Sequence, residues 1–324
     1  MTPRIPRRRF LESVGALAAG AAAFSLPWKG LLASETLYPP ADLSYFDTPI
    51  YRTAPRIRIG YAAITWDGKD RQAIEDIAAA GYPGIQLRSN CIKEFASAQE
   101  VRDLLEQHHL QMVAFSSGSL KIDPAVEADQ MATTVSHAQF THDAGGLYLQ
   151  VTSVRPKDRP IVPDDYRRLG QLMTAIGKRT ADLGVSLGFH NHMGSLGQSP
   201  EEVDQIMNAC DPRYAKLLLD VGHYYQGGGD PAKAIRKYHD RLLFLHIKDV
   251  EELPQSTDPK KTYRWVELGR GKVDTPAVFA ALRQVKFRGW AVVELDSEPD
   301  ASHTPKESAV AAKEYLEGKL GVKV

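Results

Sequence analysis

Cysteine is scarce in this chain, since only Cys91 and Cys210 occur among 324 residues. Two cysteines cannot build the disulfide framework on which small secreted domains depend. They lie in unrelated parts of the sequence, and we expect both to be free, buried thiols. The fold must therefore be stabilised by a hydrophobic core of its own.

An excess of charge of either sign is also lacking, because 40 Lys and Arg residues balance 40 Asp and Glu residues. Residues 1–33 hold five basic residues and one acidic residue, so the chain without them carries a net charge of −4. Nucleic-acid-binding domains normally show a basic footprint. The mildly acidic remainder therefore argues against a nucleic-acid partner.

Long apolar runs are absent except near the start, where Ala-rich residues 13–26 follow three arginines at positions 7–9. The run is too short for a comfortable membrane span. A basic segment before an apolar run is typical of a secretory signal, and paired arginines indicate the Tat route. We expect residues 1–33 to be a Tat signal peptide, giving a periplasmic or secreted protein without a stable membrane anchor. A disordered basic tail and a retained membrane anchor are the alternatives.

Beyond an expected extended arm at residues 34–55, which are rich in Pro, Tyr and Asp, strand-like and helix-like segments alternate. Short apolar runs bounded by turn residues are typical of buried parallel strands. Eight repeats predict an α/β fold, a single (β/α)8 barrel over residues 56–324. A doubly wound sheet is the alternative, but no Gly-rich phosphate loop follows the first strand. The predicted strands are residues 57–62, 84–87, 112–115, 147–151, 186–190, 216–220, 242–247 and 291–294.

The helix-like segments between these strands begin with recognisable signals. A Ser or Thr followed three residues later by Glu fits the capping box. Proline is favoured at the first helical position because its missing N–H has no partner there in any case. The candidate capping boxes are Ser97 with Glu100, Ser199 with Glu202 and Thr304 with Glu307, and the candidate first-position prolines are Pro200, Pro231 and Pro305.

Polar side chains end the last four predicted strands, namely His190, Asp220, His246 and Glu294. A barrel builds its active site at the carboxyl ends of its strands. A carboxylate that ends an apolar run cannot stay buried and ionised unless it is paired or bound to a metal. We therefore expect the four residues to hold one divalent cation. Imidazole and carboxylate together suit Mn, Co, Zn or Fe, and the sequence does not choose among them.

Each of these residues also has a possible role without a metal. Asp220 could cap a helix, His246 could be a satisfied core residue, and Glu294 could form a salt bridge across the barrel mouth. His190 and His192 lie two residues apart, so in an extended segment both point to the same side. Either histidine could bind the metal while the other contacts the substrate.

Five segments resemble the sugar isomerase/epimerase superfamily of xylose-isomerase-like barrels, over roughly residues 56–320. They are residues 188–192, 219–223, 245–249, 268–271 and 293–294. The resemblance implies one catalytic divalent cation at the four strand-end residues and a carbohydrate substrate. Epimerases of this superfamily have glutamate in place of His190, and many members have glutamate in place of Arg270. The histidine resembles the inosose-dehydratase-like branch, which favours elimination or hydration over epimerisation.

The implied reaction begins on a keto-sugar, whose carbonyl a cation would polarise so that an enediolate is stabilised. Glu294 is expected to remove the proton next to the carbonyl. Lys248 is expected to act as the acid or to stabilise the enolate, with its pKa lowered by the cation. A surface ion pair with Asp249 or Glu251 is the other interpretation of this lysine. The residues expected to contact substrate are Arg88, Gln150, His192, His223 and Arg270.

The sequence thus favours a metal-dependent isomerase, epimerase or dehydratase. A non-catalytic sugar-binding barrel of the periplasm and a metal-dependent hydrolase remain the rivals. Residues 152–165 and 250–273 are long connections after strands, and such loops of a barrel usually cover its active site. We expect both loops to shape the choice of substrate.

Replacing Arg7 and Arg8 together with Lys should leave the protein uncleaved in the cytoplasm, because the Tat signal depends on the arginine pair. Cell fractionation followed by immunoblotting measures both the location and the size of the chain. Periplasmic delivery at the wild-type level would show that residues 1–33 are not a Tat signal.

Overall fold

The chain divides into two units, residues 1–53 and 54–324. The computed structural model describes residues 57–254, 262–298 and 303–324, all of which belong to the second unit. The predicted signal peptide and N-terminal arm lie outside the described residues. Within the described ranges, no helix has both the length and the apolar character needed to cross a membrane.

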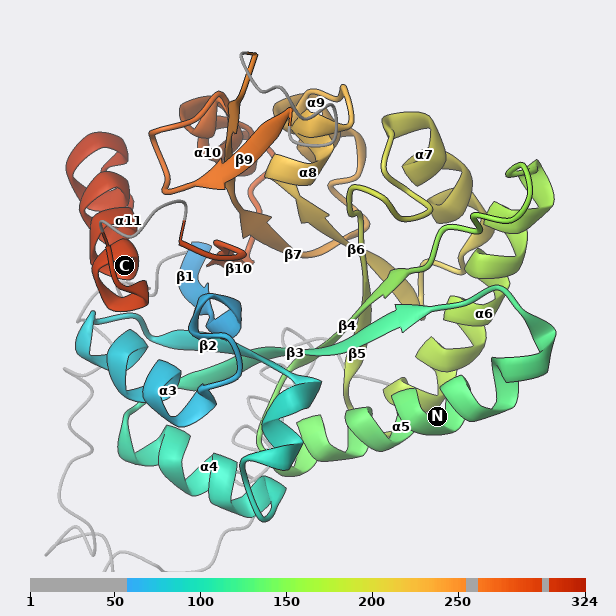
Figure 1. The fold of residues 1–324 in the computed structure, drawn as a ribbon, viewed down its shortest axis with the longest axis horizontal. Coiled ribbons are helices and arrows are strands. Elements are labelled where there is room, and N and C mark those ends of the chain that lie inside the picture. Colours follow the sequence, from blue (N-terminus) through green and yellow to red (C-terminus); the bar gives the residue numbers. More distant parts are fainter. Residues whose placement is uncertain (1–56, 255–261, 299–302) are drawn as a thin grey trace, which may run out of the picture. The chain divides into compact units, whose positions relative to one another are not determined.

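Eight parallel strands form a closed barrel (Figure 1), which confirms the predicted (β/α)8 fold. The last barrel strand pairs in parallel with the first, with Ile57 opposite Gly289, and this pairing closes the sheet. All eight predicted strands are present, and the third is longer than predicted. The strands are β1 (Ile57–Ala62), β2 (Gly84–Arg88), β3 (Gln111–Leu120), β4 (Tyr148–Ser153), β5 (Ser186–His190), β6 (Ala215–Asp220), β7 (Leu242–Ile247) and β10 (Gly289–Val293).

Helices follow the barrel strands and surround the barrel (Figure 1). The three predicted capping residues each accept a hydrogen bond from the third helical N–H, but the reciprocal bond of a full capping box forms only between Thr304 and Glu307. The predicted first-position prolines are confirmed. The α-helices are α3 (Asp70–Ala79), α4 (Ala98–Gln107), α5 (Glu127–Asp143), α6 (Pro163–Ala181), α7 (Pro200–Ala209), α8 (Val221–Gln226), α9 (Pro231–Lys237), α10 (Thr275–Gln284) and α11 (Pro305–Leu320). The part of the chain that the structure describes also has three short 3-10 helices, η2 (Ala63–Trp66), η3 (Ser89–Lys93) and η4 (Pro124–Val126).

An apolar layer lies directly below the polar strand ends. Leu218, Phe244 and Val292 belong to one buried cluster. Side chains two residues apart on a strand point to the same side of the sheet. The residues two positions further along these strands are Asp220, His246 and Glu294, which therefore stand on this apolar layer. Both cysteines are free and buried, as predicted.

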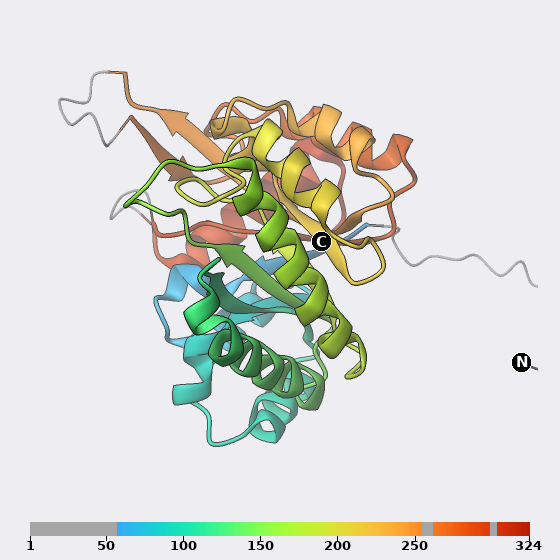
Figure 2. The same cartoon turned by 90° about the vertical axis from the view of Figure 1, so that its right-hand side faces the viewer.

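The long connection between β7 and α10 contains a two-stranded antiparallel sheet that the sequence did not indicate. Its strands are β8 (Asp249–Glu252) and β9 (Tyr263–Val266), and Figure 2 shows this hairpin extending away from the barrel. The buried Asp249 carboxylate anchors its base, since it accepts N–H bonds of 2.9–3.0 Å from Val250, Gly269, Gly271 and Val273. Four backbone donors fix both the start and the end of the connection.

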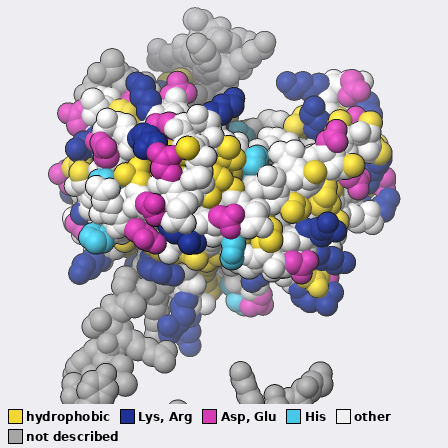
Figure 3. Space-filling view, turned by 90° about the horizontal axis from the view of Figure 1, so that it is seen from below, with side chains coloured by type: hydrophobic (Ala, Val, Ile, Leu, Met, Phe, Trp, Pro, Cys, Tyr) yellow, Lys and Arg dark blue, Asp and Glu magenta, His cyan; other side chains and the backbone are white. Residues whose placement is uncertain are grey.

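Acidic and basic side chains are interspersed on the face of the molecule that Figure 3 shows. Opposite charges that alternate over short distances give only a weak potential at a distance from the surface. That face therefore offers no extended field of one sign for a highly charged partner.

Candidate metal centre

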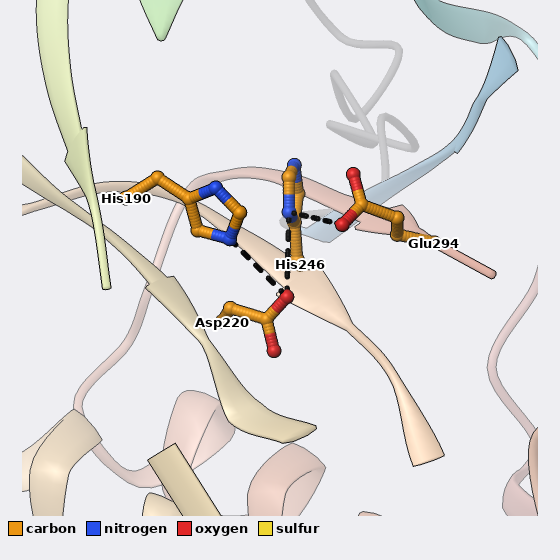
Figure 4. Close-up of side chains that lie close together, drawn as sticks. All are labelled: His190, Asp220, His246 and Glu294. Carbon is orange, nitrogen blue, oxygen red and sulfur yellow. Dashed lines mark hydrogen bonds and ion pairs between the residues drawn. The ribbon is translucent and has the colours of Figure 1, made fainter. Parts of the chain in front are cut away.

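Four side chains from four strand ends converge in the barrel mouth (Figure 4). His190 Nε2 lies 3.3 Å from Asp220 Oδ2, and His246 Nδ1 lies 3.5 Å from the same oxygen. His246 Nδ1 is also 3.3 Å from Glu294 Oε1. One nitrogen or oxygen atom from each residue lies within 4.8 Å of those of the other three, and all four residues are buried. The barrel brings together the four residues that the sequence suggested as metal ligands.

The spacing of these atoms fits a bound cation. Metal–nitrogen and metal–oxygen bonds of about 2.0–2.2 Å place the ligands of a tetrahedral ion roughly 3.3–3.6 Å apart. The three measured separations, 3.3, 3.3 and 3.5 Å, fall in this range. His246 Nδ1 is buried without a hydrogen bond although it faces two carboxylates. A buried polar atom of this kind requires a partner, and a divalent ion between it and the carboxylates would supply one.

Hydrogen bonds behind the four residues fix the orientation of the rings. His246 Nε2 lies 2.8 Å from Gln86 Oε1, so it donates a proton and leaves Nδ1 to face the carboxylates. Gln86 Nε2 donates to Gln150 Oε1, and Gln150 Nε2 lies 2.8 Å from His190 Nδ1. Such outer partners orient metal-binding histidines and set their tautomers.

Asp220 has two separate roles. Its Oδ1 accepts the His223 N–H at 2.8 Å and caps α8, while its Oδ2 faces both histidine rings. The side chain of Asn191 pairs with the backbone of Asp220 through bonds of 2.9 and 3.1 Å. Helix capping, which the sequence offered as an alternative to metal binding, therefore occurs together with the convergence on His190 and His246.

Positive charge lies close to the two carboxylates of the group. Burial favours the neutral forms of Asp220 and Glu294, but Lys248 and the nearby histidines, His223 for Asp220 and His246 for Glu294, hold the pKa of each carboxyl well below its usual value. His223 itself is neutral, because burial and Lys248 lower its own pKa. Burial alone would lower the pKa of His246, yet the Glu294 and Asp220 carboxylates raise it to about 9. Near neutral pH the two carboxylates therefore face a protonated His246. Burial lowers the pKa of His190 to about 4, so this ring is neutral.

Lys248 lies beside this group and is fully buried. Its Nζ is 3.0 Å from Glu294 Oε1, 2.7 Å from Asp296 Oδ1 and 3.3 Å from His223 Nε2. Burial would lower the pKa of Lys248, but the Glu294, Asp296 and Asp220 carboxylates outweigh burial and raise it. These carboxylates were left out of the prediction from the sequence, and the lowering of the pKa by a bound cation stays a prediction.

The alternative of a surface ion pair between Lys248 and Asp249 or Glu251 is also wrong. The Asp249 carboxylate binds backbone N–H groups, and Glu251 Oε2 lies 2.8 Å from Arg264 Nε. The β8–β9 hairpin instead covers the lysine with the Trp265 ring, whose centroid lies 4.6 Å from Nζ. The hairpin thus helps to hold the buried ammonium in place.

A cavity of about 420 Å³ opens at this group, and His190 and Glu294 line it. Three of the side chains expected to contact substrate line it, namely Arg88, Gln150 and His192. His223 is buried, and its ring centroid lies 3.8 Å from that of His192. Its Nε2 contacts Lys248, so it supports the lysine.

The structure does not bring Arg270 to this cavity. Its guanidinium lies 2.8 Å from Glu267, whose carboxylate also bonds to His303, and it is absent from the described residues that line the cavity. The loop turns away because Asp249 binds the N–H groups of Gly269 and Gly271 on either side of it.

Sequence reasoning also missed two residues of the site. Asp296 holds Lys248, and its position two residues after Glu294, on the same side of an extended segment, was the available signal. Gln86 is a buried polar residue in an apolar strand and bonds to His246. A polar residue at such a position requires a partner inside the barrel.

The fold and the grouped side chains define a (β/α)8 barrel with a candidate metal centre at the carboxyl ends of its strands. The chain belongs to the xylose isomerase-like TIM barrel family, whose model matches residues 74–318. The resemblance seen in the sequence is confirmed at the level of the family.

One relative with a known name and two solved structures show which proteins this chain is similar to. An inosose dehydratase of Lacticaseibacillus casei is 28% identical over 298 residues, which cover 82% of this chain and 98% of the relative. The crystal structure of the IOLI protein with a bound zinc atom has a TM-score of 0.68 at 18% identity, and the match covers 82% of this chain and 98% of that one. A D-allulose 3-epimerase from Methylomonas sp. in complex with D-allulose has a TM-score of 0.66 at 22% identity, with coverage of 82% and 97%. At these identities the two solved structures show a shared fold.

Asp220→Asn and His246→Ala should each lower metal occupancy strongly, because each removes a ligand atom that faces the others at 3.3–3.5 Å. Glu251→Gln is a matched control, since Glu251 pairs with Arg264 on the hairpin and should leave occupancy unchanged. Elemental analysis after dialysis against several divalent metals gives the stoichiometry. Full occupancy in both ligand variants, or a wild type that never binds metal, would mean that the site is misplaced.

Metal binding should release about one proton near pH 7, because the ion must displace the proton held by His246. The pKa of this ring is about 9 without metal, so apparent affinity should rise with pH below that value and level off above it. The carboxylates of Asp220 and Glu294, whose pKa values are lowered, contribute nothing to this slope near neutral pH. Titration calorimetry in buffers of different ionisation enthalpy counts the protons. Affinity that is constant between pH 6 and pH 8 would contradict a protonated His246.

Proposed function

We propose that this protein is a divalent-metal-dependent enzyme that acts on a keto-sugar or a related carbohydrate by removing a proton next to the carbonyl. The observation that carries the proposal is the convergence of His190, Asp220, His246 and Glu294 beneath a cavity, beside the buried ammonium of Lys248. Relatives named as inosose dehydratase and D-allulose 3-epimerase support a carbohydrate substrate. When bound, a divalent cation would polarise the substrate carbonyl and acidify the neighbouring C–H.

Glu294 is the proposed base. It lines the cavity and stands at the end of the last barrel strand, and its lowered pKa keeps it in the ionised form that can accept a proton. A base in this form works best where the acidity of the substrate is raised, as it is for a C–H beside a polarised carbonyl. Burial beside His246 and Lys248 fixes the position of the carboxylate. A base that is already held in place lowers the entropic cost of reaching a reactive geometry.

Lys248 is the proposed stabiliser of negative charge on the substrate oxygen, acting from behind the described residues that line the cavity, which do not include it. The carboxylates around it keep the ammonium charged, and contacts to Asp296, His223 and Trp265 hold it in one place. A preorganised cation in a water-poor site stabilises developing charge without reorganising. This role needs an ammonium that stays protonated, in keeping with its raised pKa.

Elimination or hydration is the favoured outcome over epimerisation. Epimerisation needs proton transfer on both faces of the reacting carbon, whereas the His190 position offers a neutral imidazole that faces Asp220. Glu294 is the carboxylate proposed to transfer the proton on one face of the reacting carbon. Similarity to proteins named inosose dehydratase agrees with this preference.

Proton exchange tests the proposal. The metal-loaded protein is incubated in heavy water with a panel of keto-sugars, keto-inositols and 3-keto-glycosides. Proton NMR should show that solvent deuterium replaces the proton next to the carbonyl of a substrate. Glu294→Gln should lower the exchange rate by about 10²–10⁴-fold, because a positioned base is lost. Lys248→Met should retain some exchange while net turnover falls, and Glu251→Gln, outside the cavity, serves as the control.

Near-normal turnover in Glu294→Gln would remove Glu294 from the mechanism. A wild-type protein that binds metal and sugar without any exchange would point instead to a sugar-binding barrel, and one that hydrolyses a substrate without exchange to a metal-dependent hydrolase.

A further inference from the structure

An unbroken chain of side chains links the two histidines behind the candidate metal centre. His246 Nε2 lies 2.8 Å from Gln86 Oε1, Gln86 bonds to Gln150, and Gln150 Nε2 lies 2.8 Å from His190 Nδ1. Gln86 is 2% exposed and Gln150 is 5% exposed, yet both line the cavity. Bulk water therefore supplies few of the hydrogen bonds of the two amides, which depend on each other and on the two histidines for partners.

Hydrogen bonds in this chain all run in one direction. His246 donates to Gln86, Gln86 donates to Gln150, and Gln150 donates to His190 Nδ1. His190 must then carry its proton on Nε2, which faces Asp220 Oδ2 at 3.3 Å. Two amides that are hydrogen-bonded to each other need a donor at one end of this series of side chains and an acceptor at the other end. The metal-free protein meets this requirement.

A metal ion bound by both histidines would leave this series of hydrogen bonds without an acceptor at either end. The atoms that face the carboxylates are His190 Nε2 and His246 Nδ1, so both outward nitrogens, His190 Nδ1 and His246 Nε2, must then carry protons. The chain would have a donor at each end. If both amides turn, the contact between two N–H donors moves from His190 to His246. No orientation of the two amides satisfies both rings and also keeps the bond between Gln86 and Gln150.

We propose that metal binding turns the Gln150 amide so that Gln86 and Gln150 together bind one hydroxyl or carbonyl oxygen of the carbohydrate through their two NH₂ groups. This inference rests on the proposed function, since it requires a metal at His190 and His246. Each amide carbonyl then accepts from one histidine, and the two NH₂ groups face each other across the cavity wall. An oxygen atom with two lone pairs accepts from both, whereas a C–H group at the same place accepts from neither.

The consequence is a coupling between metal and substrate. A buried donor without a partner weakens binding by roughly five- to hundredfold, so an oxygen that pairs with both amides strengthens the metal-bound state. By linkage, the same factor applies to the effect of the metal on the affinity for the carbohydrate. Gln86 and Gln150 would thus recognise a correctly placed oxygen only when the metal is present.

Histidine tautomers provide the first test, because ¹⁵N NMR of histidine-labelled protein shows which ring nitrogen carries the proton. Zinc is a suitable diamagnetic probe. On adding one zinc per chain, the His190 proton should move from Nε2 to Nδ1, while His246 keeps its Nε2 proton. A His190 ring that keeps its proton on Nε2 with zinc bound would overturn the inference and exclude His190 as a ligand, whereas zinc held by Asp220, His246 and Glu294 would leave the proposed function standing. Absence of bound zinc would overturn both the inference and the proposed function.

Glutamate in place of either glutamine provides the second test. A carboxylate accepts at both ends, so Gln150→Glu or Gln86→Glu supplies the missing acceptor and should tighten zinc binding by about tenfold or more. Thr152→Glu is the matched control for charge. It adds a carboxylate on the same strand and also at the cavity, but not between the histidines, and should change zinc affinity far less. Equal tightening in all three variants would show that charge alone acts, and would overturn the inference.

The role of the substrate oxygen is tested by measuring zinc affinity with and without D-allulose or myo-inositol. In the wild type at least one of these should strengthen zinc binding severalfold, and in Gln150→Glu the effect should vanish, because one NH₂ group is gone. The same effect in both proteins, or none in either, would overturn oxygen binding by the glutamine pair.

Discussion

Two carboxylates buried in a barrel mouth need positive charge close by, and the other features of the site follow from this need. Asp220 is fully buried and Glu294 is 5% exposed, so neither can remain ionised without cationic partners. His246 and Lys248 supply that charge in the metal-free protein. A divalent ion would replace the proton of His246 and leave the ammonium of Lys248 in place, so the same carboxylates bind the metal and hold the lysine.

The barrel contributes the precision of this arrangement. Pairing between β6 and β7 sets Asp220 opposite His246, and the apolar residues two positions earlier on the strands form a layer that shuts the site off from below. Asn191 fixes the backbone of Asp220, and Asp249 fixes the loop that follows β7. These contacts fix the floor of the site, whereas polar side chains such as Arg88 and Arg155 line the cavity.

The eight strands and the four converging residues could be predicted because each depends on a local pattern, an apolar run that ends in a polar side chain. Features that depend on which strands face each other could not. Lys248 was placed in the site, but its partners Asp296 and His223 come from segments whose proximity only the closed barrel determines. Arg270 was expected to contact the substrate, yet the four backbone bonds of Asp249 turn that loop toward Glu267. Gln86 was not predicted to be part of the site, because its role depends on a bond to a residue 160 positions away.

X-ray absorption spectroscopy at the edge of the metal in the loaded wild-type protein is the most direct test of the four-residue metal centre, because it counts and identifies the atoms around the ion. We expect one metal per chain with two imidazole nitrogens and carboxylate oxygens at about 2.0–2.2 Å, and no sulfur. A shell with only oxygen atoms, or with a single imidazole, would contradict a centre built from His190, Asp220, His246 and Glu294.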